Sequence, residues 1–458
     1  MSAELLSRRT LLAGGATALT APAERRIIGA NDRVGVGFIG YGLIGKRHVV
    51  SFKQLADVDI VAVSDTHAGR LAEAASFIGG AVKPYADFRR LLEDPAVDAV
   101  VISTPDHWHA LMTMLACAAG KDVYVEKPLT LFVQEGEWML SVARKHRSIV
   151  QVGTQQRSGA HYARARDLIR SGELGKVTSV RMGAARNIMP GFGRPADCQP
   201  PAELNWDLWL GPAPARAYNP NRGIYHFRWF WDYSGGQMTN LGQHSLDIVE
   251  WVLGTQGLQS VYSNGGRFAL TDNGETPDTQ DAHFQFPGWS AAWMHREAAR
   301  GETRIPSLEF CGTRGSLTID RAGFKLSGDP DLAPENFIPQ FTGAHPVGGP
   351  RRTPPPAQVN PRTPPRVDES GSSDGQFVAH ARNFIDCIRS RATPVSDLAS
   401  AHRVATLCHL ANLSLRLGRQ LHWDPEHATL IGDPEAAAML RRPYRAPWDR
   451  ELTALGVG

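Results

Sequence analysis

The stretch Val34-Gly35-Val36-Gly37-Phe38-Ile39-Gly40-Tyr41-Gly42-Leu43-Ile44-Gly45 decides the fold. An apolar run of strand type ends here in a G-x-G-x-x-G pattern, and residues 46–55 continue at helical spacing. In such a turn the first glycine allows the tight bend, the second lets a pyrophosphate approach the backbone, and the third lets helix pack on strand. We therefore expect a dinucleotide-binding unit in which the cofactor contacts Gly40, Gly42, Leu43, Ile44 and Gly45. Taken alone, the pattern also fits a glycine-rich turn that binds nothing.

An acidic residue follows at the expected distance. The apolar run 60–63 ends in Ser64-Asp65, about 20 residues past the last glycine, where a carboxylate binds the ribose 2′-hydroxyl of NAD. A 2′-phosphate would meet the negative charge of Asp65. The sequence thus predicts NAD as cofactor in preference to NADP.

Residues 66–153 alternate between helix and strand patterns, as a doubly wound parallel sheet requires. Helices are expected at 71–78, 88–92, 110–119 and 133–146, and strands at 99–103, 123–125 and 149–152. Two of these strands end in polar motifs, Thr104-Pro105-Asp106-His107-Trp108-His109 and Glu126-Lys127-Pro128. Because ligands bind at the carboxyl ends of parallel strands, we assign Thr104, Pro105, His109, Glu126 and Lys127 to the cofactor site. Trp108 is a candidate for the substrate pocket, and the alternative for Trp108 and His109 is a helix start with an aromatic ring packed beneath it.

Composition sets the broad class. The chain has 458 residues, 42% hydrophobic and 21% charged, which suggests a globular protein of two domains. A net charge of +3 without a basic block gives no indication of nucleic-acid binding, and beyond the N-terminus no apolar run reaches the roughly 20 residues of a membrane span. The five cysteines are scattered and include no C-x-x-C pair, so neither a disulfide framework nor a metal site is indicated.

The N-terminus has the pattern of an export signal. Arg8-Arg9 precede a short, weakly apolar run that ends in Ala21-Pro22-Ala23. Paired arginines, a short apolar region and an A-x-A site are typical of a twin-arginine signal peptide. We expect residues 1–30 to be signal and linker and the mature protein to be periplasmic or secreted; the alternative is a disordered tail with a chance arginine pair.

The pattern changes after residue 153. We expect helices at 162–171, 377–389 and 399–417, and strands at 176–184, 258–264, 282–286, 291–294, 308–311 and 316–319. This suggests a largely antiparallel sheet, with a proline-rich surface excursion at about 346–365. The predicted fold is α/β: a Rossmann domain at 31–153, then an α+β substrate and oligomerisation domain at 154–458 with a large, mostly antiparallel open sheet.

Several segments together resemble the Gfo/Idh/MocA family of glucose-fructose oxidoreductase and inositol dehydrogenase. They are the glycine turn, the E-K-P motif, Gly153-Thr154-Gln155-Gln156-Arg157, Asn205-Trp206-Asp207-Leu208-Trp209-Leu210-Gly211 and Gly235-Gly236-Gln237-Met238-Thr239-Asn240-Leu241-Gly242-Gln243-His244. The twin-arginine start and the run His226 to Tyr233 resemble an exported branch of the family. The resemblance implies a homo-oligomer, a dimer or tetramer, formed through the C-terminal sheet.

The resemblance also implies catalytic residues. The lysine of E-K-P is Lys127, and the histidine of the family's D-x-x-x-H pair is His244, but Asn240 stands at the aspartate position. An amide cannot take up a proton, so Asn240 can only orient its neighbours by hydrogen bonding. Asp247 is a candidate substitute, or a residue that caps or pairs.

The chemistry of these residues suits the oxidation of an alcohol. A base must remove the hydroxyl proton while hydride leaves the carbon, and His244 suits that role because histidine titrates near neutrality. Lys127 can stabilise oxyanion charge, and burial would lower its pKa toward a proton-transfer range. The alternatives are a solvated surface lysine and a core or capping histidine.

Further candidates rest on position and resemblance. Gln155 is assigned to the cofactor, and Arg157, Tyr225 and Arg228 to the substrate, with a structural ion pair as the alternative for Arg157. The aromatic cluster Trp229, Phe230, Trp231 and Tyr233 could stack on sugar faces, although dense aromatic residues more often form core.

These features predict an exported NAD-dependent oxidoreductase that acts on a secondary hydroxyl of a sugar, sugar derivative or glycoside. Outside the cytoplasm free NAD is not expected, so the nucleotide should be tightly held and regenerated in place. One alternative is a redox-assisted, net redox-neutral glycoside hydrolase or lyase. The other is a nucleotide-bound sensor without turnover.

Overall fold

The computed structural model describes residues 32–301, 303–328 and 367–458. The expected signal peptide and the proline-rich excursion at 346–365 lie outside these residues. In the described part of the chain, no helix combines the length and apolar character needed to cross a membrane.

The first sheet has six parallel strands in the order β3-β2-β1-β4-β5-β6. They are β1 Val34–Ile39, β2 Val58–Ser64, β3 Lys83–Tyr85, β4 Ala99–Ile102, β5 Asp122–Val125 and β6 Val150–Val152. Every residue of β1, β4, β5 and β6 is buried, as expected for parallel strands covered on both faces. This sheet confirms the predicted Rossmann fold.

The Rossmann helices follow the predicted alternation. They are α1 Leu43–Phe52, α2 Ala68–Ile78, α3 Phe88–Leu92, α4 His109–Ala118 and α5 Val133–His146. Helix α2 begins three residues before the expected start, because the His67 side chain accepts a hydrogen bond from Arg70 N and caps the first turn.

The second sheet has ten strands in the order β14-β13-β12-β11-β7-β10-β9-β8-β15-β16. They are β7 Val177–Ala185, β8 Ser260–Gly266, β9 Thr279–Phe286, β10 Trp289–Arg296, β11 Leu308–Gly312, β12 Ser316–Asp320, β13 Gly323–Ser327, β14 Val367–Ser370, β15 Leu421–Asp424 and β16 Thr429–Leu430. All pairs are antiparallel except β7 with β10, which confirms the mostly antiparallel sheet.

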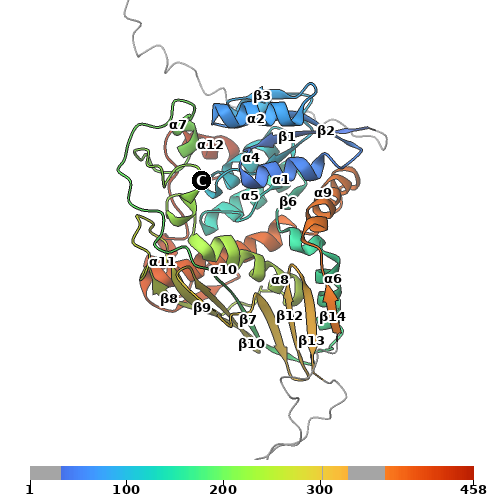
Figure 1. The fold of residues 1–458 in the computed structure, drawn as a ribbon, viewed down its shortest axis with the longest axis vertical. Coiled ribbons are helices and arrows are strands. Elements are labelled where there is room, and N and C mark those ends of the chain that lie inside the picture. Colours follow the sequence, from blue (N-terminus) through green and yellow to red (C-terminus); the bar gives the residue numbers. More distant parts are fainter. Residues whose placement is uncertain (1–31, 302, 329–366) are drawn as a thin grey trace, which may run out of the picture.

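Helices of the second half connect the two sheets (Figure 1). They are α6 Ala160–Arg170, α8 Gln243–Leu253, α9 Ser373–Ser390, α10 Leu398–Leu417, α11 Pro434–Ala438 and α12 Trp448–Leu455. Helices α8 and α10 lie between the sheets, while α9 and α12 reach the Rossmann sheet (Figure 1). Phe384 of α9 shares a buried cluster with Phe38 and Phe52, and the Trp448 ring of α12 lies 4.8 Å from that of Trp108. Hydrophobic core therefore crosses the domain boundary that we predicted near residue 153.

A long connection, residues 186–229, leaves β7 and crosses to the edge of the Rossmann sheet. We call it the strap; it contains α7 Trp206–Leu210 and the short 3-10 helix η3 His226–Trp229. Ala68 N donates to Glu203 O at 2.8 Å and Asn205 N donates to Thr66 O at 2.9 Å, so the strap is bonded to the loop after β2.

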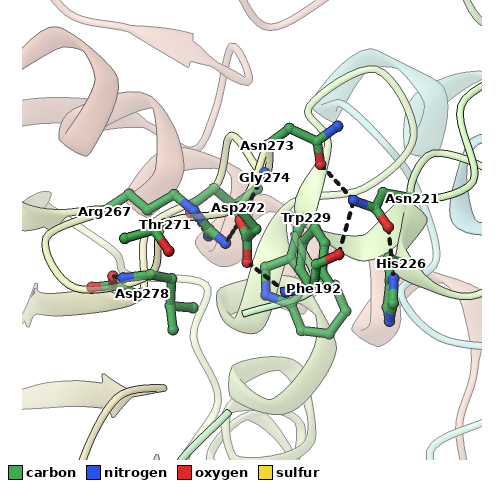
Figure 2. Close-up of polar contacts among 12 residues, drawn as sticks. Phe192, Asn221, His226, Trp229, Arg267, Thr271, Asp272, Asn273, Gly274 and Asp278 are labelled. Atoms are coloured by element: carbon green, nitrogen blue, oxygen red, sulfur yellow. Dashed lines mark hydrogen bonds and ion pairs between the residues drawn. The ribbon is translucent and has the colours of Figure 1, made fainter. Parts of the chain in front are cut away.

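A polar network fastens the base of the strap (Figure 2). The Asn221 amide nitrogen donates to Phe192 O, to Gly193 O and, at 2.8 Å, to Asn273 Oδ1. Buried Asp272 accepts from Phe192 N and pairs with Arg267. These contacts tie both arms of the strap to the loop between β8 and β9.

Candidate active site

The glycine turn has the geometry expected of a dinucleotide site. Gly40 has a φ of +93°, and a Cβ there would lie 2.8 Å from Ser103 O. A Cβ on Gly45 would lie 2.2 Å from Gly40 O, so only glycine permits this close packing of helix on strand. A Cβ on Gly42 would meet only the Arg70 guanidinium, at 3.8 Å, which leaves the approach to this backbone open.

A pocket of about 930 Å³, which includes space open to solvent, adjoins this turn. The predicted residues that line it are Gly40, Gly42, Leu43, Ile44, Asp65, Thr104, Pro105, Trp108, Tyr225 and Arg228. Helix α1 begins there without a side-chain cap, which leaves N–H groups for a phosphate. The Asp65 carboxylate accepts from Tyr41 N and His67 N and so has a fixed position on the pocket wall. These features fit NAD.

The strap covers the other side of this pocket. Leu208, Trp209, Ile224 and Phe227 line it opposite the glycine turn. His107 Nε2 and Trp108 Nε1 both donate to Trp209 O at 2.9 Å. The polar motif after β4 therefore holds the strap in place, a role that the sequence did not indicate for His107 and Trp209.

Glu126 and Gln155 belong to a buried network beneath the site and do not line this pocket. Glu126 Oε1 lies 2.7 Å from His48 Nε2 and accepts from Gln155 Nε2 at 2.7 Å. Burial would raise the pKa of Glu126, but the hydrogen bond and charge of His48 and the charge of Lys127 hold it below its usual value. His48, three residues past the G-x-G-x-x-G pattern, was not singled out from the sequence.

His109 is also internal and outside the pocket lining. Its Nδ1 lies 2.6 Å from Pro128 O and its Nε2 lies 2.9 Å from Thr104 O. The ring thus bridges the turns after β4 and β5. It thereby helps to position Lys127, the residue before Pro128.

Lys127 projects from the end of β5 toward the second domain. Its Nζ donates to Asn240 O at 3.1 Å and to Asn240 Oδ1 at 3.0 Å. Burial, together with the charges of Arg228 and Arg321, lowers the pKa of Lys127 to about 8, while the charges of Glu126 and Asp106 act in the opposite direction. This is the direction expected from burial.

Asn240 lies in a π-helical turn, Met238–Gly242, just before α8. Its Nδ2 donates to Gln237 Oε1 at 3.1 Å while its Oδ1 accepts from Lys127. Because donor and acceptor are both engaged, the amide has one orientation and holds the lysine amine in place.

His244 lies in the first turn of α8, with Nε2 3.5 Å from an Arg321 guanidinium nitrogen. Burial and the charges of Lys127 and Arg321 lower the pKa of His244 well below its usual value. The expectation that it titrates near neutrality is therefore wrong. His244 is neutral at physiological pH, and the lysine amine is the better proton acceptor.

Arg157 has the structural role that we gave as the alternative to substrate binding. Its guanidinium forms a buried ion pair with Asp247 at 2.8 Å and donates to Ser400 Oγ. Asp247 is therefore a pairing residue and does not replace the carboxylate missing at Asn240. Among the aromatic residues, Trp229, Phe230 and Tyr233 are buried, which confirms the core alternative for these three.

Comparisons with known proteins agree with this geometry. A family model described as "Oxidoreductase family, NAD-binding Rossmann fold" matches residues 34–154, and one described as "Oxidoreductase family, C-terminal alpha/beta domain" matches 166–264 and 367–450. The scyllo-inositol 2-dehydrogenase (NAD(+)) of Bacillus subtilis is 30% identical over 284 residues, covering 61% of this chain and 72% of the relative.

Two further comparisons cover most of the chain. The myo-inositol 2-dehydrogenase of Thermotoga maritima is 24% identical, covering 62% of this chain and 75% of the relative. The structure of levoglucosan dehydrogenase in complex with NADH and levoglucosan superposes with a TM-score of 0.63 at 18% identity, covering 85% of this chain and 99% of that one. The nucleotide pocket agrees with these matches. The family models and the inositol dehydrogenase relatives show that the chain belongs to the Gfo/Idh/MocA family of NAD-binding oxidoreductases.

Proposed function

We propose that the protein oxidises a secondary hydroxyl of a sugar, sugar derivative or glycoside with NAD as the hydride acceptor. The observation that carries this proposal is Lys127, an amine with a pKa of about 8 that Asn240 holds at the mouth of β5, close to His244. The inositol and levoglucosan dehydrogenases support the substrate class, because their named substrates carry secondary hydroxyls on a ring.

The chain's own residues handle the proton. A bound NAD would supply the acceptor for the hydride that leaves the substrate carbon. Neutral Lys127 takes the proton from the hydroxyl, so alcohol and NAD⁺ give ketone, NADH and an ammonium group. Asn240 keeps the amine in place, and neutral His244 offers a hydrogen bond to the reacting oxygen.

We further propose that the nucleotide is tightly held and the protein exported. The strap lines the pocket opposite the glycine turn and is hydrogen-bonded at Thr66, Ala68, His107 and Trp108, which supports a slow exit of the nucleotide. A twin-arginine signal suits a protein that folds around its cofactor before export. Substrates would then regenerate the nucleotide in place.

The ten-stranded sheet suggests how copies associate. Alternate residues of β9 such as His283 and Gln285 are exposed on the face opposite α8 and α10. This uncovered face supports a dimer or tetramer.

Two other functions make different predictions. A redox-assisted glycoside hydrolase or lyase would release an aglycone without net NADH, and the dehydrogenase relatives that match most of this chain do not favour it. A sensor would bind nucleotide without turnover.

The test is to purify the full chain as exported, denature a sample, and identify any nucleotide that is released. Intact protein is then mixed with a panel of sugars and glycosides, and absorbance of reduced nicotinamide and release of aglycone are followed. We expect near-stoichiometric NAD(H) and a spectral change with at least one sugar.

Lys127→Ala should abolish that change, whereas Lys325→Ala, which removes an exposed lysine paired with Asp368, should not. A protein that neither carries nucleotide nor binds added NAD would refute both enzymatic functions.

A further inference from the structure

Three cationic side chains gather at the substrate end of the site. Lys127 contacts Asn240, Arg228 lines the pocket wall, and Arg321 extends from the turn between β12 and β13 to His244. Arg321 comes from a part of the chain that the sequence did not connect with the site.

Each carboxylate near this end of the site already has a partner. Glu126 is bonded to His48 and Gln155, and Asp247 is paired with Arg157. Asp106 accepts a hydrogen bond from Ser234, and burial raises the pKa of Asp106 against the charges of His109, Arg228 and Lys127. Asn240 supplies no charge where the family has an aspartate.

Within the described ranges, neither Arg228 nor Arg321 forms an ion pair with a carboxylate. Arg228 donates to Tyr225 O at 3.2 Å and its guanidinium lies 4.6 Å from the Phe227 ring centre. Arginine does not lose its proton in proteins, so Arg321, which is exposed, offers a permanent positive charge to any anion that binds next to His244. Arg228 lines the pocket at the glycine turn, where nucleotide phosphates would bind, whereas Arg321 contacts His244.

Resting on the proposed function, we propose that the substrate is an anionic sugar whose carboxylate or phosphate group is bound by Arg321 while its reacting hydroxyl lies at Lys127. A planar guanidinium suits either anion, since it can donate two parallel hydrogen bonds. His244, next to Arg321, then lies between the anionic group and the reacting carbon. The missing aspartate fits this arrangement, because a carboxylate at residue 240 would repel such a substrate.

The test uses matched ligands with the nucleotide-loaded full chain. Methyl glycosides of glucose, galactose and mannose are compared with the corresponding uronides, which differ only at C6, and with the 6-phosphates. Binding is measured by calorimetry at low and high salt, and reduced nicotinamide is followed separately. We expect at least one anionic ligand to bind about tenfold or more tightly than its neutral partner, with the difference shrinking at high salt; the uronide and phosphate arms identify the anion.

Variants test the assignment to Arg321. Arg321→Gln should remove the preference for the anion, and Arg321→Lys should retain part of it. Arg314→Gln alters an exposed arginine in the turn before β12 and should leave the preference intact. Asn240→Asp should also reduce anion binding.

Two outcomes would overturn the proposal. One is that no anionic ligand binds better than its neutral partner, and the other is an anion preference that survives Arg321→Gln. Turnover of neutral sugars alone would refute the anionic substrate and leave the dehydrogenase standing. Binding of an anion without any nicotinamide reduction would instead count against the dehydrogenase.

Discussion

Lys127 shows how neighbouring charges adjust one amine for proton transfer. Its pKa of about 8 reflects burial and the charges of Arg228 and Arg321, opposed by Glu126 and Asp106. Alcohol oxidation needs the neutral amine, so we expect kcat/KM for oxidation to rise as pH increases through about 8 and then level off. The reverse reduction needs the ammonium and should fall over the same range. Steady-state kinetics in both directions from pH 6 to 9.5 measures this.

Lys127→Arg provides the matched variant, because arginine keeps the positive charge but cannot accept a proton near neutrality. It should bind sugar yet lose roughly 10²–10⁴-fold in kcat, the usual contribution of general acid–base catalysis. A pH profile that is flat between 7 and 9, with rate limited by the chemical step, would exclude Lys127 as the base.

The role of a single residue could be predicted from the sequence where it depends on neighbouring residues in the chain. The conformations of Gly40 and Gly45 and the position of Asp65 follow from the turn itself, and the sequence indicated them. The low pKa of His244 comes from burial and from the charges of Lys127 and Arg321, and Arg321 lies 77 residues away along the chain. Likewise, the ion pair of Arg157 with Asp247 spans 90 residues. A short sequence motif cannot include two residues so far apart, so these contacts could not be predicted from it.

The strap is the element that we expect to slow the release of bound nucleotide. Trp108→Phe removes one of the two N–H groups that donate to Trp209 O and keeps most of the ring packing. A lost neutral hydrogen bond is worth about 0.5–1.5 kcal/mol, so release of bound NADH should accelerate by roughly two- to tenfold. Stopped-flow displacement of NADH by excess NAD, followed by fluorescence, measures the rate. Trp289→Phe, in β10 of the other sheet, is the control.

An unchanged release rate in Trp108→Phe, with the variant folded, would mean that the strap does not limit nucleotide exit. The same result would weaken the proposal of a captive cofactor.

Elements with a strong periodic pattern were predicted closely. The bounds of α5 were those expected, because fourteen residues of amphipathic pattern leave little doubt about a helix. Strands β3, β13, β14, β15 and β16 were missed; they are short, and β3 has only three residues, none of them fully buried. The covering role of the strap was also missed, since its proline- and glycine-rich sequence has no periodicity to reveal where it packs.

At the scale of the whole molecule, the C-terminal helices join the two sheets into one packed unit. The buried face of α9 completes the core beside β1, and α12 lies against α4. This packing places many histidines in the interior. Burial lowers the pKa of His107, His295 and His380 to about 4 and that of His409 to about 3.

These histidines predict that stability falls in mild acid. Their unfolded pKa is about 6.5, so above that pH neither state binds their protons and stability is complete. Below it the unfolded chain takes up protons that the folded protein excludes until about pH 4. Each histidine therefore removes up to about 1.4 kcal/mol of unfolding free energy per pH unit. Urea unfolding at pH 7.5, 6.5, 5.5 and 5.0 should show a steep decline that begins near 6.5, above the range in which carboxylates titrate.

Substitution separates these histidines from other causes of acid sensitivity. His295→Gln removes one buried titrating ring, so it should lower stability at pH 7.5 yet make the decline between pH 6.5 and 5.0 shallower by about one histidine's share. His427→Gln removes an exposed ring paired with Asp424 and should leave the slope as it is. Only His295→Gln removes a ring that stays unprotonated in the folded protein. Equal slopes of unfolding free energy against pH in the two variants would therefore show that the buried histidines do not cause the loss of stability in acid.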